Sequence, residues 1–161
     1  MKTVVVYYSL QGNVRYVAEK VSKGLNADLI ELVPVKAYPD KGAKKFLWGG
    51  KSSVMKEEPE LLPYSFNSVE YDTIIIGTPV WASNMTPPIR SFIKQNREQL
   101  KQKRIAVAVC FSGGGANKAI SRLADFIGIE KFISELILID PKDKPDPEND
   151  NKIEQFVTSL S

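Results

Sequence analysis

Short runs of apolar, often β-branched residues alternate with stretches of helical periodicity along the chain, and this alternation constrains the fold more than any other feature. It is typical of βαβ units, in which parallel strands are joined by crossover helices. The apolar runs are continuous, which indicates strands that are covered on both faces. The predicted strands are residues 3–8, 28–33, 73–77, 105–110 and 136–140. We therefore expect a parallel sheet with helices packed on both of its faces.

Between the strands, apolar residues recur at spacings of three and four, which predicts helices that bury one face. These stripes lie within residues 14–25, 89–93, 116–127 and 153–160, and Gly128 is expected to end the third helix. Thr86 and Pro87 predict an N-cap and a first-turn proline. Residues 35–68 predict an extended loop with one helix around residues 43–54. Residues 142–151, rich in Pro and Asp, predict a solvated connection without a chemical role and a last helix that begins near Asp150.

The composition limits the chemistry that the side chains can perform. The chain has 161 residues, 43% of them hydrophobic and 25% charged, so we expect one globular domain over residues 1–161. It has no histidine and a single cysteine, Cys110, which excludes an internal disulfide, a multi-cysteine metal site and a histidine-activated nucleophile. We expect Cys110 to be a buried small hydrophobe. A bound cofactor is then the expected source of chemistry.

Two further classes of function are disfavoured by simple counts. No apolar run approaches the ~20 residues that a membrane-spanning helix needs, so no membrane insertion is expected. The 22 Lys and Arg residues exceed the 19 Asp and Glu residues by three, and this dispersed surplus is too small to predict nucleic-acid binding. The single cysteine and the missing signal peptide predict a cytoplasmic protein.

The first candidate site follows the first predicted strand, because the loops at the carboxyl ends of parallel strands form the binding crevice of such a sheet. Ser9, Gln11, Gly12, Asn13 and Val14 lie between this strand and the first helix. Backbone N–H groups and the positive end of the helix dipole can converge there on a phosphate. Ser9 and Gln11 can add side-chain hydrogen bonds, Gly12 permits a tight turn, and Asn13 can cap the helix. The alternative is a capped turn with a structural role only.

Two more loops end on the same rim. The third strand is followed by Thr78, Pro79, Val80, Trp81 and Ala82, which can present an indole ring and backbone polar groups to a flat ligand. The alternative for Trp81 is that it covers the core beside Pro79. The fourth strand leads to the remaining candidates, Ser112, Gly113 and Gly114. Consecutive glycines allow close approach of the backbone to a ligand, although they are also typical of a flexible turn.

At these loops the sequence resembles the flavodoxin family. The stretch Y-S-x-x-G-N resembles the flavodoxin phosphate loop S/T-x-T-G-x-T, with Gln11 and Val14 in place of threonines. The stretch G-T-P-V-W-A-S-N resembles the flavin-contacting loop of bacterial flavodoxin-like proteins. The resemblance implies an α/β fold, a three-layer α/β/α sandwich with a five-stranded parallel sheet of strand order 2-1-3-4-5, and FMN as the cofactor. The stretch W-G-G-K, which contains Trp48, also resembles flavodoxin-like relatives. The Trp48 side chain could form a wall of the flavin or partner site, or it could only pack its loop against the domain.

The function implied by the resemblance is electron transfer through FMN, as a shuttle between redox enzymes. One alternative is an FMN-dependent NAD(P)H:quinone reductase, an oxidoreductase on the same fold. A second alternative is a binding module that has kept the fold and lost the flavin, since Gln11 and Val14 remove two hydroxyl donors. The expected partners are redox proteins, a reductase and an acceptor, and the expected state is a monomer. A pI near 8.9 predicts that the partner carries an acidic patch.

Overall fold

The computed structural model describes residues 1–40 and 56–161. Strands and helices alternate as the sequence predicts, apart from a short 3₁₀ helix, η1 (Ser68–Glu70), before β3. The strands are β1 (Thr3–Tyr7), β2 (Asp28–Glu31), β3 (Thr73–Pro79), β4 (Arg104–Phe111) and β5 (Glu135–Ile139). The helices are α1 (Asn13–Leu25), α3 (Pro87–Leu100), α4 (Ala116–Ile127) and α5 (Pro147–Leu160). The helix predicted around residues 43–54 and Trp48 lie outside the described residues.

All five strands run parallel in one sheet of order β2-β1-β3-β4-β5, so the predicted fold class and strand order are confirmed. Val5 of β1 lies opposite Leu29 of β2 on one side and Ile75 of β3 on the other. The order reverses at β1, because β2 lies on one side of it and β3 on the other. This is the switch point at which parallel α/β sheets bind ligands.

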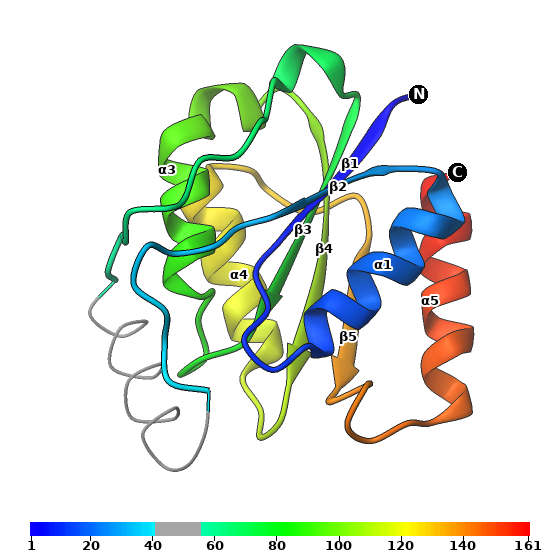
Figure 1. Ribbon diagram of the computed structural model, residues 1–161. Coiled ribbons are helices and arrows are strands. Elements are labelled where there is room, and N and C mark those ends of the chain that lie inside the picture. The colour runs from blue at the N-terminus through cyan, green and yellow to red at the C-terminus, as the bar shows by residue number, and fades with distance from the viewer. Residues whose placement is uncertain (41–55) are drawn as a thin grey trace.

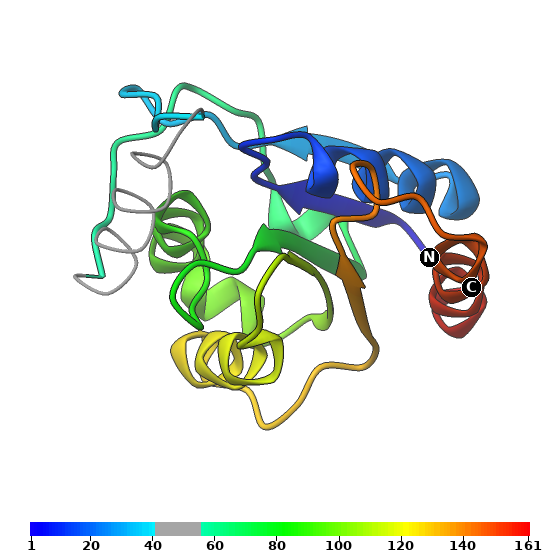
Figure 2. The ribbon, with the colours of Figure 1, turned by 90° about the horizontal axis from the view of Figure 1, so that it is seen from below.

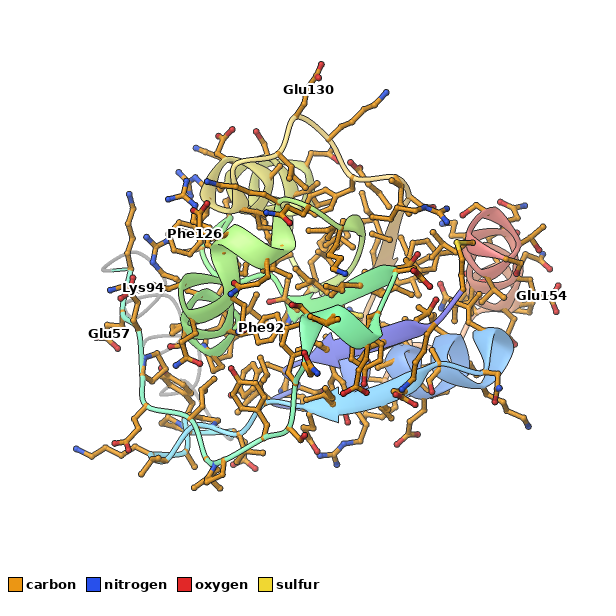
Figure 3. The ribbon with its side chains drawn as sticks, turned by 90° about the horizontal axis from the view of Figure 1, so that it is seen from above. Glu57, Phe92, Lys94, Phe126, Glu130 and Glu154 are labelled. Atoms are coloured by element: carbon orange, nitrogen blue, oxygen red, sulfur yellow. The ribbon has the colours of Figure 1, made fainter. Side chains whose placement is uncertain are left out.

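The sheet is the middle of three layers, with α1 and α5 on one face and α3 and α4 on the other (Figures 1 and 2). Side chains of β3 alternate between two apolar cores, since Ile74 and Ile76 face α3 and α4 whereas Ile75 faces α1 and α5. Phe92 of α3 is fully buried beside the sheet, and Lys94 projects outward from the same helix (Figure 3). Burial on both faces explains why β1, β3 and β4 are largely apolar. The prediction is wrong for the edge strand β2, which begins at Asp28, ends at Glu31 and is exposed or half-buried along its length.

The last helix begins earlier than the sequence suggested. We expected a start near Asp150, but α5 starts at Pro147 with Asp146 as its N-cap. The Asp146 carboxylate accepts a hydrogen bond from the Glu148 N–H at 2.9 Å, and proline is favoured at the first helical position because it has no N–H to satisfy there. The Asp-Pro pair is therefore the helix start, and the polar composition before it misled the prediction.

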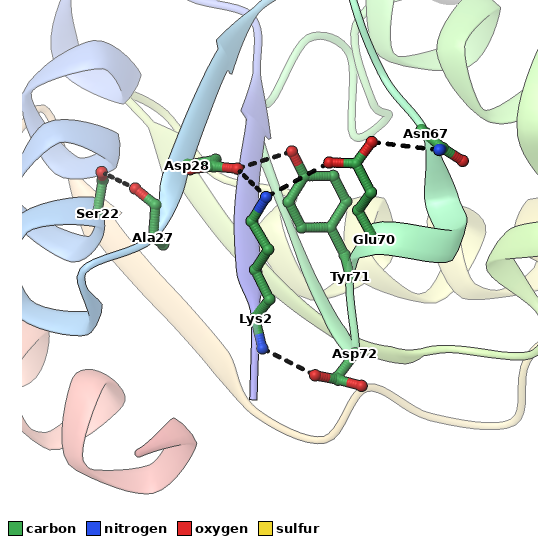
Figure 4. A network of polar contacts seen from close by, with 8 residues as sticks. All are labelled: Lys2, Ser22, Ala27, Asp28, Asn67, Glu70, Tyr71 and Asp72. Atoms are coloured by element: carbon green, nitrogen blue, oxygen red, sulfur yellow. Dashed lines mark hydrogen bonds and ion pairs between the residues drawn. The ribbon is translucent and has the colours of Figure 1, made fainter.

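At the amino ends of the strands, a polar network fastens β1 to the segments beside it (Figure 4). The Lys2 ammonium lies 3.1 Å from the Asp28 carboxylate and 3.4 Å from that of Glu70. The Tyr71 hydroxyl donates to the same Asp28 oxygen at 2.8 Å, and this bond, followed by that from Lys2, lowers the pKa of Asp28. The network stabilises the edge of the sheet that contains the amino ends of the strands.

None of the helices in the described part of the chain is long and apolar enough to cross a membrane. In residues 1–40 and 56–161 there is also no group of three or more Asp, Glu, Cys or His side chains placed to hold a metal ion.

Candidate functional site

A cavity of about 570 Å³ opens at the carboxyl-terminal edge of the sheet, the edge toward the viewer in Figure 2. We call it the edge cavity. It lies between the loops that follow β1, β3 and β4 and the end of β5, and its volume is in the range of small-molecule sites. Of the predicted site residues it brings together Ser9, Gln11, Asn13, Val14, Pro79, Val80, Trp81, Ala82, Ser112, Gly113 and Gly114. Gly12 and Thr78 do not line it.

The start of α1 forms one end of the edge cavity. Gly12 is the N-cap residue, with a φ of 95° that glycine adopts without strain, and no side chain caps this helix. The N–H groups of Asn13, Val14 and Arg15 have no hydrogen-bond partner among the described residues. Exposed amides and the helix dipole at one point make a site for an anion.

Ser9 supports the same turn. Its Oγ accepts a hydrogen bond from the Gly12 N–H at 3.1 Å. A hydroxyl can donate while it accepts, so the Ser9 hydrogen remains available to a ligand oxygen. Gln11 is exposed, and Val14 is buried with a methyl group directed toward Gly77 of β3. An anion at this turn would therefore meet backbone amides and the Ser9 hydroxyl, without hydroxyls at positions 11 and 14.

Asn13 does not cap the helix, contrary to the sequence prediction. Its Oδ1 accepts from the backbone N–H of Lys142 at 2.9 Å and of Asp143 at 3.3 Å, and its Nδ2 donates to Asp143 Oδ2 at 2.9 Å. Gly12 takes the N-cap position instead, because its left-handed backbone turns the chain into the helix. The Asn13 side chain thus holds the β5–α5 connection against the anion site.

The second loop is a tight turn with fixed hydrogen bonding. Trp81 and Asn84 exchange backbone bonds of 3.1 and 3.0 Å around Ala82 and Ser83, which have φ values of 49° and 57°. The Val80 N–H donates to the Cys110 carbonyl at 3.0 Å. The N–H groups of Val80 and Trp81 are therefore used within the protein. Those of Ala82 and Ser83 have no partner in the part of the chain that the structure describes, so they can serve a ligand.

Thr78 lies inside the protein, and its side chain is not on the cavity wall. The residue is fully buried, its Oγ1 lies 3.0 Å from Thr86 Oγ1, and it accepts from the Thr86 N–H at 3.2 Å. Thr86 is the N-cap of α3 as predicted, but its side chain makes no capping bond. The two threonines close the base of the second loop.

Trp81 lies on the cavity wall and also packs against neighbouring aromatic rings. It lines the edge cavity, and its ring packs edge-on against Tyr8 at 5.8 Å and Tyr38 at 5.4 Å between centroids. Edge-to-face packing at this distance favours a fixed ring position. Burial raises the pKa of the Tyr8 phenol, so this hydroxyl is uncharged at neutral pH.

The third loop contributes backbone donors and a link to β5. Ser112 donates to Asp140 Oδ1 at 2.8 Å, and the Asp140 N–H donates to the Phe111 carbonyl at 3.2 Å. The N–H groups of Gly113 and Gly114 have no partner among the described residues. Gly115 touches the second loop, since a Cβ there would lie 2.3 Å from Ser83 Oγ. The second and third loops therefore meet at the cavity rim.

The edge cavity is also lined by five residues that were not among the predicted site residues, namely Leu10, Ser83, Cys110, Phe111 and Asp140. Asp140 follows β5 directly, with a positive φ of 39°, and not within a strand as predicted. The residues that follow β5 could have been predicted in the same way as the first three loops, because the carboxyl ends of all parallel strands lie at the same edge of the sheet. The connection predicted to have no chemical role thus starts at the cavity wall.

Cys110 lines the cavity but its thiol is protected. The residue is 5% exposed, and burial, followed by the negative charge of Asp140, raises the pKa of its thiol to about 12.

We expect that dithionitrobenzoate does not modify Cys110 in the native protein at pH 8, and that the guanidine-unfolded protein reacts with one equivalent of the reagent. The absorbance at 412 nm measures this reaction. Because the thiol ionises more readily when unfolded, its contribution to stability should fall as pH rises from about 9 toward 12. Fast stoichiometric modification of native protein at pH 8 would contradict this.

Comparison with known proteins agrees with the fold. A family model described as flavodoxin matches residues 2–130. A flavoprotein from Lactobacillus acidophilus NCFM, crystallised in complex with FMN, is 22% identical, with a TM-score of 0.72 over 88% of this chain and 95% of its own. A putative flavoprotein from Bacteroides eggerthii is 19% identical, with a TM-score of 0.75 over 99% and 94%. Two-electron reduced flavodoxin from Megasphaera elsdenii is 14% identical, with a TM-score of 0.59 over 99% of both chains.

These structures share the three-layer fold, and their low identity extends the likeness no further than the fold. The family model matches most of the chain, including the loops after β1, β3 and β4 that form the edge cavity. By this match the chain belongs to the flavodoxin family.

Proposed function

We propose that the chain binds FMN in the edge cavity and acts as an electron-transfer protein between redox enzymes. One observation carries the proposal: a cavity of about 570 Å³ joins an uncapped helix start, suited to a phosphate, to a wall that includes Trp81 and glycine-rich backbone, suited to a flat ring. Bound FMN supplies one- and two-electron redox chemistry at its isoalloxazine ring.

The residues present fit FMN. The N–H groups of Asn13 and Val14 and the Ser9 hydroxyl would bind the phosphate. The N–H groups of Ala82, Ser83, Gly113 and Gly114 are donors for the polar edge of the ring, and Trp81 would shield one side of it. That the Lactobacillus acidophilus flavoprotein was crystallised with FMN supports this assignment.

The protein's own task is then binding, orientation and exclusion of water. The sequence has no histidine, and the Cys110 thiol in the cavity is buried and protonated at neutral pH. An electron carrier needs no side chain that transfers protons to a substrate. This chemistry favours the carrier over a reductase that must bind and protonate a second substrate.

A second hollow suggests how a partner docks. It is lined by Lys56, Arg90, Lys118 and Arg122 with Asp125, and it shares Ala82 and Ser83 with the edge cavity. We call it the basic pocket. A positive surface beside the ring attracts a negatively charged partner by long-range electrostatics. The proposed partners are therefore a reductase and an acceptor with acidic docking patches, met by a monomer in the cytoplasm.

The proposal is tested on the purified protein. A yellow sample that releases FMN on denaturation, and that takes up electrons stepwise in an anaerobic titration, supports FMN binding and electron transfer. Steady oxidation of NADPH in the presence of a quinone would instead show that the protein is a reductase. A colourless protein that cannot be reconstituted with FMN would leave a binding module on the same fold.

The basic pocket makes a separate prediction about acceptors. In the FMN-loaded, reduced protein, Lys118→Glu with Arg122→Glu should slow reoxidation by ferricyanide, an anion, by roughly tenfold at low salt and speed reoxidation by hexaammineruthenium(III), a cation. Stopped-flow absorbance measures both rates. Lys23→Glu with Lys131→Glu, at exposed positions outside the basic pocket, changes the net charge equally and should have a much smaller effect. Equal effects of the two pairs would contradict docking at this pocket.

A further inference from the structure

The β5–α5 connection is folded onto the start of α1. Asn13 holds the backbone N–H groups of Lys142 and Asp143, and the Lys144 N–H donates to the Asp140 carbonyl at 2.7 Å. The connection is therefore fixed at both ends of its first turn. Its position relative to the anion site is set by hydrogen bonds and does not depend on a flexible chain.

This arrangement lays the Lys142 side chain across Gly12. A Cβ built on Gly12 would lie 3.0 Å from Lys142 Cε and 3.9 Å from Lys142 Nζ. Gly12 is the residue whose turn exposes the first N–H groups of α1. The ammonium group therefore lies next to the glycine that begins the helix, immediately outside the residues that line the edge cavity. A longer side chain at position 12 would occupy the same space.

The local charges make Lys142 available to an anion. Its Nζ forms an ion pair with Asp143 Oδ1, and the two side chains are 42% and 46% exposed. An exposed pair of this kind contributes little in water, so exchanging or sharing the carboxylate with a phosphate is not opposed by a large free energy. Without the ammonium, the Asp143 carboxylate held by Asn13 would repel a phosphate at the same turn.

We propose that Lys142 is a ligand of the FMN phosphate and supplies the stabilisation that positions 11 and 14 lack. The inference rests on the proposed binding of FMN. Gln11 and Val14 offer no hydroxyl, so a charge-assisted bond from Lys142 replaces neutral hydrogen bonds with a stronger one. Lys142 lies beyond residues 2–130, so it is outside the part of the chain that the family model matches.

The experiment separates phosphate binding from ring binding. Apo-protein is titrated with FMN and with riboflavin, which has no phosphate, and flavin fluorescence gives both dissociation constants. Lys142→Met should weaken FMN binding roughly fivefold to tenfold and leave riboflavin binding unchanged. Lys142→Arg should keep most of the FMN affinity. The salt dependence of FMN binding should be smaller in Lys142→Met than in the wild type.

Two further variants serve as controls. Lys23→Met removes the same charge from the far end of α1, about 16 Å along the helix, and should change neither affinity. Asp143→Asn removes the competing carboxylate and keeps an acceptor for Asn13, so FMN should bind severalfold more tightly. Urea unfolding confirms that each variant is folded.

The outcomes distinguish the two proposals. If Lys142→Met leaves FMN affinity unchanged, or weakens FMN and riboflavin equally, the phosphate role of Lys142 is overturned while FMN binding stands. If the wild type binds neither flavin, the proposed function fails and the role of Lys142 fails with it. Selective loss of FMN affinity, retained by Lys142→Arg, supports the proposal.

Discussion

Gly77→Ala should lower the free energy of unfolding by about 3 kcal/mol, and Gly77→Val should prevent stable folding. A Cβ on Gly77 would lie 2.9 Å from Tyr7 Cβ and 3.1 Å from Val14 Cγ1. Both neighbours are buried, Tyr7 in the adjacent strand and Val14 in the first turn of α1. Neither can move without shifting a strand or a helix, so the strain is not relieved locally. Urea denaturation followed by circular dichroism measures the loss.

The same substitution should weaken flavin binding in whatever protein remains folded. Val14 is in the turn that exposes the N–H groups of α1, so pushing it away from β3 moves the proposed phosphate site. For the change in stability, Gly113→Ala is the matched control, because no atom lies within 4 Å of its Cβ position. We expect that control to change stability by less than about 0.5 kcal/mol. Similar losses for both alanine variants would show that Gly77 is not a packing constraint.

The fold could be predicted because its determinants are local in sequence. β1, β3 and β4 lie inside the sheet with helices on both faces, so their sequences are mainly apolar and stand out from the helical stripes. The start of α5 was misplaced, because Asp146 and Pro147 lie in a segment rich in Asp and Pro and were interpreted as part of a loop. Their capping geometry, not their hydrophobicity, starts the helix.

The site was predictable as far as topology fixes it. Parallel strands bring their carboxyl ends to one edge, so the loops after β1, β3 and β4 had to share a rim. The inward hydroxyl of Thr78 was not predictable, because it depends on Thr86 in the folded loop. Nor was the partner of Asn13, which is 129 residues away, since local capping rules offered a nearer role for the same side chain. Contacts between distant segments need the structure.

Asn13→Ala is the variant that should most clearly connect stability with binding. Asn13 is 7% exposed and makes three hydrogen bonds to Lys142 and Asp143. Removing its side chain leaves a space at the start of α1 and frees the β5–α5 connection. We expect the free energy of unfolding to fall by about 2 kcal/mol, because three hydrogen bonds are lost. The loss is not larger, because water can reach the N–H groups that the connection then exposes. Chemical denaturation of the apo-protein measures this change.

The effect of Asn13→Ala on FMN binding should exceed that of Lys142→Met. Lys142→Met removes one charge, whereas Asn13→Ala releases the backbone that places Lys142 beside Gly12 and also loosens the start of α1. We expect roughly a 30-fold rise in the FMN dissociation constant and a smaller rise for riboflavin. An unchanged dissociation constant for FMN would show that the connection does not support the site.

Asn13→Asp gives the same prediction a pH dependence. The introduced carboxyl keeps an acceptor for the two backbone N–H groups but faces the Asp143 carboxylate, which had accepted from Nδ2. Like charges at this distance raise the pKa of the introduced group above its unfolded value. The folded state is then penalised at pH 7, and the penalty falls as pH is lowered toward the unfolded pKa near 4. The stability of the variant relative to the wild type should therefore rise as the pH is lowered from 7 to 5. A constant difference over that range would show that the two carboxyl groups do not interact.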